Sequence, residues 1–285
     1  MSCEERPENP LADDDSSLIS IGAIGNVRLT DVAAGACTLT GPAGTAVDPY
    51  AEMGPPPLGH GGWKSSRQLS PLLDAWMTNL QYFSNEYGTY GSITTLYHNG
   101  MFVKRAEQRT FHNVGRAIDI KGIDWAGGQI FRPCAGNEEM TPLTRYRWLV
   151  GVEASLRKYF GNVLPRGYPS HADHYHADDG CPVGFSTAKE TNRLFARDCI
   201  RAFTSNPLSI KYDSRDWDAD DDNTDADESG TDTRALNALL AAMGMDCFDI
   251  NRNVSEFLIF LDYIMMHAFA DQSAGHYRWG GLIDL

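Results

Sequence analysis

Two stretches in the middle of the chain carry apolar residues at helical spacing. From Ser70-Pro71 onward, apolar side chains recur every three or four positions: Leu72, Leu73, Trp76, Met77, Leu80 and Phe83. Because serine caps helices and proline fits a first turn, this pattern predicts a helix that faces the core. Residues 141–160 repeat the pattern, and Gly161 is a typical stop for this second helix.

Shorter apolar runs between turn residues predict strands. Residues 93–97 and 117–120 are the clearest, and 19–32 can supply one or two more. Helical spacing returns near the end of the chain at 234–243 and, most strongly, at 254–269. Helices mixed with short strands predict an α+β fold, with extra helices at the C-terminus.

Composition divides the chain into four parts. Residues 1–64 begin acidic and then become rich in Gly, Ala, Thr and Pro, which predicts a flexible segment and connector. Residues 65–208 hold the helical and strand patterns of a compact domain. An acidic linker (209–233) follows, and residues 234–285 form a C-terminal helical segment. Calcium binding is the alternative role for the acidic linker, although no EF-hand-type loop can be laid on it.

Charge and hydropathy exclude two classes of partner. The 285 residues carry a net charge of −14 with a pI near 4.9, which argues against nucleic acid and anionic membrane surfaces. No apolar run is long enough to span a membrane. The start shows no secretory signal, so we expect a chain that stays inside, leaves by a signal-independent route, or has been trimmed. The six cysteines form no CxxC pair, and disulfides are possible without a deducible pairing.

Candidate chemistry is concentrated between residues 171 and 178, in the run His-Ala-Asp-His-Tyr-His-Ala-Asp. Its histidine spacing does not fit one helical face, whereas His174 and His176 fit the same face of a strand. Imidazole is a common zinc ligand, and each ligating ring usually needs a partner for its other nitrogen. Asp173 and Asp178 are close enough in sequence to serve as such partners.

A second stretch completes a possible ligand set. His112 and Asp119 lie seven residues apart and can meet at one metal if Gly115 turns the chain between them. Together with an imidazole from the histidine run, they give three protein ligands and an open fourth position. That arrangement is typical of catalytic rather than structural zinc. His98, in a predicted turn, is expected to be structural or solvent-exposed.

These residues resemble the motifs of a known superfamily. The pattern Thr110-x-His112-x-x-Gly115-x-Ala117-x-Asp119 is similar to the Ser-x-His-x-x-Gly-x-Ala-x-Asp motif of D-alanyl-D-alanine carboxypeptidases and hedgehog proteins. The closer resemblance is to the bacterial extensin-like C-terminal domain family, in which His-x-x-His-x-His-x-Asp closes the second motif. The likeness covers about residues 65–205. It implies a small antiparallel sheet flanked by helices.

The resemblance also implies roles for individual residues. His112, Asp119 and His176 would hold Zn²⁺, and His174 would act beside the metal on bound water or the oxyanion. His171 would contact substrate or support the ligands. Three further residues would support the ligands or contact the substrate: Asp173, Arg109 and Thr110. Thr110 replaces the usual serine but keeps the hydroxyl, and Asp173 is the nearest substitute for the glutamate of the Glu-x-x-His variant.

The implied activity is zinc-dependent hydrolysis of an amide bond in peptidoglycan stem peptides or cross-links, by an endo- or carboxypeptidase. Such an enzyme would act in the periplasm or cell envelope. Without a visible signal peptide, we expect an exported antibacterial effector, with secretion machinery and an immunity protein as partners, or a phage lysin. The alternative is a non-catalytic zinc-containing module that binds the cell wall or a partner. A purely structural protein would leave both motifs unexplained.

Overall fold

The structure is a computed structural model, and the part of the chain that it describes is discontinuous. It comprises residues 3–12, 14–25, 27–31, 39–40, 46–47, 63–105, 108–128, 130–131, 133, 143–165, 168, 171, 174–183, 191, 195, 198–199, 202–203, 240 and 254–270. The acidic linker (209–233) and almost all of 234–243 lie outside this part.

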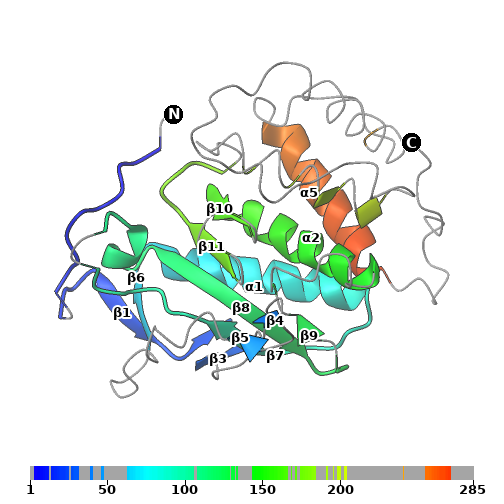
Figure 1. The fold of residues 1–285 in the computed structure, drawn as a ribbon, viewed down its shortest axis with the longest axis horizontal. Coiled ribbons are helices and arrows are strands. Elements are labelled where there is room, and N and C mark those ends of the chain that lie inside the picture. Colours follow the sequence, from blue (N-terminus) through cyan, green and yellow to red (C-terminus); the bar gives the residue numbers. More distant parts are fainter. Residues whose placement is uncertain are drawn as a thin grey trace.

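A mixed sheet forms the centre of the molecule (Figure 1). Its strand order is β10-β11-β8-β7-β3-β2, with β9 also paired to β8. The bounds are β2 Ala23–Ile24, β3 Val27–Asp31, β7 Ile93–His98, β8 Ala117–Trp125, β9 Ile130–Phe131, β10 Asn162–Leu164 and β11 Tyr175–Asp178. All these pairs are antiparallel except β3 and β7, which run parallel.

Two short ribbons lie outside this sheet. β1 (Leu18–Ile21) pairs antiparallel with β6 (Trp63–Ser66), and β4 (Leu39–Thr40) pairs antiparallel with β5 (Ala46–Val47). Within 1–64, strands β2 and β3 add to the edge of the main sheet. The division of the chain into four parts stays a prediction, while β2 and β3 place two short segments of the first part in the main sheet.

Of the helices whose bounds the structure describes, α1 (Leu69–Glu86), α2 (Leu143–Arg157) and α5 (Val254–Phe269) pack into the core with the sheet. α5 packs against α2, so the C-terminal helix is joined to the main core (Figure 1). Side chains of α1, β8 and α5 share one continuous apolar cluster, for example Trp76, Ile120 and Phe260. This arrangement confirms the predicted α+β class with its C-terminal helix. No described helix is long and apolar enough to cross a membrane.

The helix starts differ from the sequence predictions. α1 begins at Leu69 with Gln68 at its N-cap position, so Ser70 is not the cap. Instead the Ser66 hydroxyl, from the end of β6, accepts from the Leu69 N–H at 3.0 Å. A serine four residues earlier therefore satisfies the first turn, and sequence pattern alone could not choose between the two. α2 occupies residues 143–157, within the predicted 141–160.

Candidate metal centre

Three elements bring the predicted ligands together. The short helix η1 (Phe111–Val114) carries His112, β8 carries Asp119 and β11 carries His176. The Thr110 hydroxyl caps η1 by accepting from the His112 N–H at 3.3 Å. Gly115 ends η1 in the left-handed region, with φ of 67°, and thereby turns the chain into β8. The register of β8 and β11 pairs Asp119 with His176, so their side chains lie on the same face of the sheet.

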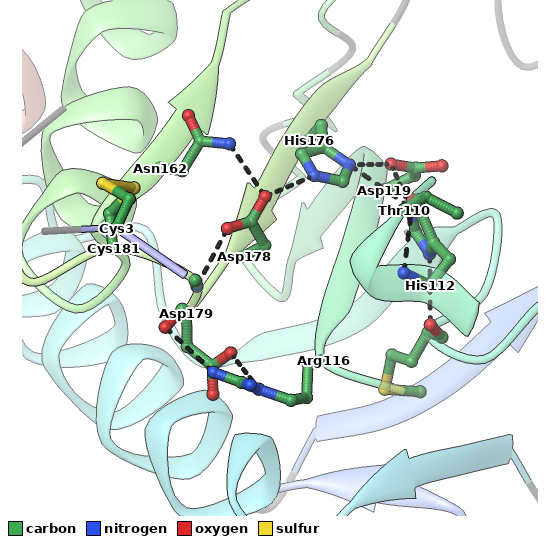
Figure 2. Close-up of polar contacts among 12 residues, drawn as sticks. Cys3, Thr110, His112, Arg116, Asp119, Asn162, His176, Asp178, Asp179 and Cys181 are labelled. Carbon is green, nitrogen blue, oxygen red and sulfur yellow. Dashed lines mark hydrogen bonds and ion pairs between the residues drawn. A yellow bond between two sulfur atoms is a disulfide. The ribbon is translucent and has the colours of Figure 1, made fainter. Parts of the chain in front are cut away.

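The three ligand atoms converge closely (Figure 2). His112 Nε2 lies 3.1 Å from Asp119 Oδ1, and His176 Nδ1 lies 2.9 Å from the same oxygen. The two imidazole nitrogens are 3.2 Å apart. All three residues are buried, with exposed fractions of 2%, 5% and 7% for His112, Asp119 and His176. The group can therefore hold a metal ion, as the sequence predicted.

The outward-facing nitrogens of both histidines have partners, which tests whether the group fits a metal. His112 Nδ1 lies 3.1 Å from the Met101 carbonyl oxygen, which can only accept a hydrogen bond. His176 Nε2 lies 2.9 Å from Asp178 Oδ2. In neutral rings these contacts place the protons outward, so His112 Nε2 and His176 Nδ1 direct lone pairs at the Asp119 carboxylate. Three acceptors that face one another need a cation between them, and the residues fit one.

Asp178 is itself held in place. Asn162, from β10, donates through Nδ2 to Asp178 Oδ2 at 2.8 Å, and the Gly180 N–H donates to Oδ1 at 3.0 Å (Figure 2). Asp178 is thus the carboxylate that orients His176, one of the two aspartates that the sequence offered for this purpose. The other, Asp173, lies outside the described residues.

The electrostatics of the metal-free group follow from these contacts. Burial lowers the pKa of His176, but hydrogen bonds and charges of Asp119 and Asp178 outweigh burial and raise it to about 9. Burial raises the pKa of Asp119, and the neighbouring imidazoles outweigh it, so the Asp119 pKa lies well below its ordinary value. At neutral pH a proton on His176 therefore supplies the positive charge that the two carboxylates require.

Two further imidazoles lie beside the ligand group. His174 Nε2 is 3.8 Å from Asp119 Oδ1, just before the start of β11. The His171 ring lies 4.7 Å from the His174 ring and 5.8 Å from the His176 ring, and Tyr168 packs against it at 5.6 Å. The structure thus gathers four histidines in one cluster, and three of them, His112, His174 and His176, lie within 3.8 Å of Asp119 Oδ1.

The side chain of Arg109 lies at the surface. Its guanidinium forms an ion pair with Glu8, and both side chains are more than half exposed. The neighbouring residue, Thr110, does support the group, because its hydroxyl accepts from the backbone N–H of His112 and so caps η1.

An N-terminal strap, here defined as residues 3–12, contacts both motifs and was not predicted from the sequence. A disulfide joins Cys3 to Cys181, three residues after Asp178 (Figure 2). Glu4 forms an ion pair with Arg116. The Asn113 side chain, on η1, donates to the carbonyl oxygen of Glu8 at 3.2 Å. The only sequence signal for the strap was the presence of Cys3 and Cys181, and their pairing could not be deduced from spacing.

His98 is buried beneath the same region, with 1% of its surface exposed. It ends β7, and its Nδ1 accepts from the Gly100 N–H at 2.9 Å. Burial lowers the pKa of His98 to about 4, against a smaller opposing effect of Asp119, so the ring is neutral at pH 7. Of the two environments that the sequence allowed for His98, the structure therefore shows the buried one.

Comparison of the chain with protein-family models, with curated proteins and with solved structures finds no match.

Proposed function

We propose that this protein is a zinc-dependent hydrolase that cleaves an amide bond in peptidoglycan peptides. The observation that carries the proposal is the convergence of His112, Asp119 and His176 with an outer acceptor on each imidazole. Two nitrogens and one carboxylate oxygen form a donor set that suits zinc. Three protein ligands leave one position for water or substrate, as in catalytic zinc sites.

A bound zinc ion would polarise the scissile carbonyl and lower the pKa of a water molecule in the site. The chain's own residues would orient the reactants and move protons. His174 Nε2, 3.8 Å from a ligand oxygen, is close enough to exchange a proton with a group bound at the open position. His171 lies next to His174 and would contact the substrate peptide or hold the His174 ring.

The substrate class rests on the resemblance to peptidoglycan-cleaving peptidases in both motifs. A site of action in the periplasm or cell envelope is supported by the Cys3–Cys181 disulfide, because disulfides persist in oxidising compartments. An exported antibacterial effector, with an immunity protein in the producing cell, or a phage lysin would meet both conditions.

The proposal is tested by incubating the zinc-loaded protein with purified peptidoglycan and measuring the masses of released fragments. We expect cleaved stem peptides or cross-links, inhibition by a chelator, and at least a 100-fold loss of rate in His112→Ala and His176→Ala. A matched control is Asp179→Asn, which alters the ion pair with Arg116 on the same turn but no ligand contact. Full activity in either histidine variant would overturn the assignment. Stoichiometric zinc without cleavage would favour the non-catalytic binding module.

Localisation is tested by directing the protein to the periplasm or the cytoplasm of a bacterial host. We expect lysis or growth arrest only on periplasmic expression, because peptidoglycan is accessible only there. Harmless periplasmic expression of folded, zinc-loaded protein would contradict an antibacterial role.

A further inference from the structure

The turn formed by residues 98–103 (the His98 turn) contacts both ligand-bearing elements. The Asn99 N–H donates to the Asp119 carbonyl oxygen at 2.9 Å, and the Val103 N–H donates to the His112 carbonyl oxygen at 3.1 Å. Between them, the Met101 carbonyl oxygen faces His112 Nδ1 at 3.1 Å. One short turn therefore contacts the backbone of two ligands and the imidazole of one of them.

The conformation of this turn is held by the His98 side chain. His98 Nδ1 accepts from the N–H of Gly100, two residues later, which closes the turn locally. Gly100 has φ of 102°, a region that residues with a Cβ rarely adopt. Trp63 packs edge-on against the imidazole, with ring centroids 4.2 Å apart.

If position 98 served packing alone, a histidine would be less stable there than an apolar residue, because its ring buries a polar nitrogen. Because Nδ1 accepts a hydrogen bond, the neutral ring carries its proton on Nε2. Among the described residues, no acceptor lies within hydrogen-bond reach of that buried nitrogen. An apolar side chain would fill the same space against Trp63 without burying an unsatisfied donor. The acceptor at Nδ1 therefore explains why an imidazole stands at this position.

We infer that His98 is a positioning residue of the metal centre, fixing the turn whose Met101 carbonyl sets the tautomer and orientation of His112. The inference rests on the metal centre of the proposed function, and it does not depend on the reaction or the substrate. His98 would contact neither metal nor substrate. It would act through the Gly100 N–H and the Met101 carbonyl on His112, and through Asn99 on the strand that carries Asp119.

Two substitutions separate the acceptor from the packing. In His98→Asn, the amide Oδ1 occupies the place of Nδ1 and can accept from the Gly100 N–H. In His98→Phe, the ring against Trp63 remains but the acceptor is lost. Both variants and the wild type would be titrated with Co²⁺ and Zn²⁺, and the visible spectrum of the Co²⁺ form would report the ligand geometry.

We expect His98→Phe to bind either metal roughly 10–100-fold more weakly and to alter the Co²⁺ spectrum, as is typical when an outer partner of a ligand is lost. His98→Asn should retain affinity within about threefold and the wild-type spectrum, since it restores the acceptor that orients the outer shell. Wild-type affinity and spectrum in His98→Phe would overturn the inference, and so would equal losses in the two variants. A wild type that binds neither metal would instead refute the proposed metal centre.

If His98→Phe does not fold, Gly100→Ala tests whether the conformation of the His98 turn controls metal binding. An added Cβ would make only ordinary contacts, 3.5 Å from Trp63 and 3.6 Å from Val103, so its main effect is on φ of the turn. We expect weakened metal binding and an altered Co²⁺ spectrum. The control is Gly128→Ala, which also has a positive φ but open space around the new Cβ and no link to the ligands. Unchanged metal binding in Gly100→Ala would contradict the inference.

Discussion

His176 lies between two carboxylates, and this position decides how the metal centre responds to pH. Asp119 contacts Nδ1 and Asp178 contacts Nε2, which raises the pKa of His176 from 6.5 to about 9 in the metal-free protein. A metal ion must displace the proton from Nδ1. Metal affinity should therefore rise with pH up to about 9, and binding at pH 7 should release protons.

The same shift makes the metal-free fold sensitive to alkaline pH. A raised folded-state pKa contributes stability that is complete below about 6.5 and is lost as pH rises through about 9. We expect the free energy of unfolding of the metal-free protein to fall over this window, measured by denaturant titration. The zinc-loaded protein should show no such fall, because zinc has already replaced the proton.

The control for this dependence is His176→Asn, which should abolish it. His98 and His267, whose pKa values burial lowers to about 4, titrate below the window and cannot produce it. A metal-free protein with constant stability from pH 6.5 to 9 would contradict the described contacts of His176.

At the residue scale, the sequence predicted the ligands better than their supports. The spacing of His112, Asp119 and His176 matched a known motif, and side-chain chemistry limited the choices. The Met101 carbonyl could not be predicted, because a backbone acceptor carries no signature in residue type. The sequence offered both Asp173 and Asp178 as the partner of the outer nitrogen of a histidine ligand. Asp178 contacts His176 because it lies on the same face of the strand.

At the scale of elements, the junction between η1 and β8 is the most constrained part of the site. A Cβ on Gly115 would lie 2.8 Å from Leu18 Cδ2 and 2.9 Å from the Ser66 N atom, and the residue has φ of 67°. We expect Gly115→Ala to lose about 1–2 kcal/mol from the left-handed conformation and about 1–3 kcal/mol from crowding. Denaturant unfolding measures the sum.

Gly128→Ala separates these two contributions. Gly128 also has a positive φ, of 89°, but a new Cβ there would have no atom within 4 Å. This variant should lose only the conformational part. Equal losses of stability at the two glycines would show that the contacts of Gly115 with Leu18 and Ser66 do not constrain the junction.

The disulfide of the N-terminal strap is expected to stabilise the fold. The Cys3–Cys181 disulfide joins residues 178 positions apart, so it restricts a very long loop of the unfolded chain. We expect Cys3→Ser/Cys181→Ser to lower the free energy of unfolding by about 2–5 kcal/mol. A reductant should lower the Tm of the wild type and leave that of the double variant unchanged. No response of the wild type to reductant would contradict the strap.

Among elements, repeated apolar spacing was the dependable signal. The predicted 254–269 helix coincides with α5, and the predicted 93–97 strand lies within β7. The parallel pairing of β3 with β7 was not predicted, because residue patterns do not encode which strands become neighbours. The start of α1 was placed two residues late, since Ser66 reaches the first turn from outside the helix.

For the whole molecule, the predicted α+β class is confirmed, and the sheet positions the site by pairing β11 with β8. Sequence could not predict that the N-terminal strap would be joined to the turn after β11 or that α5 would pack against α2. Both contacts join segments far apart in the chain, and such contacts depend on the folded shape rather than on local pattern. The strap and the sheet together fix the relative positions of η1, β8 and β11, which carry His112, Asp119 and His176.

The most direct test of the metal centre is a zinc titration of the purified, metal-free protein, with bound metal measured by elemental analysis. We expect one zinc ion per chain in the wild type and in the Asp179→Asn control. We expect loss of stoichiometric zinc in His112→Ala, Asp119→Ala and His176→Ala. A wild type that binds no zinc, or triad variants that bind it as well as the wild type, would contradict the assignment of this group as a metal centre.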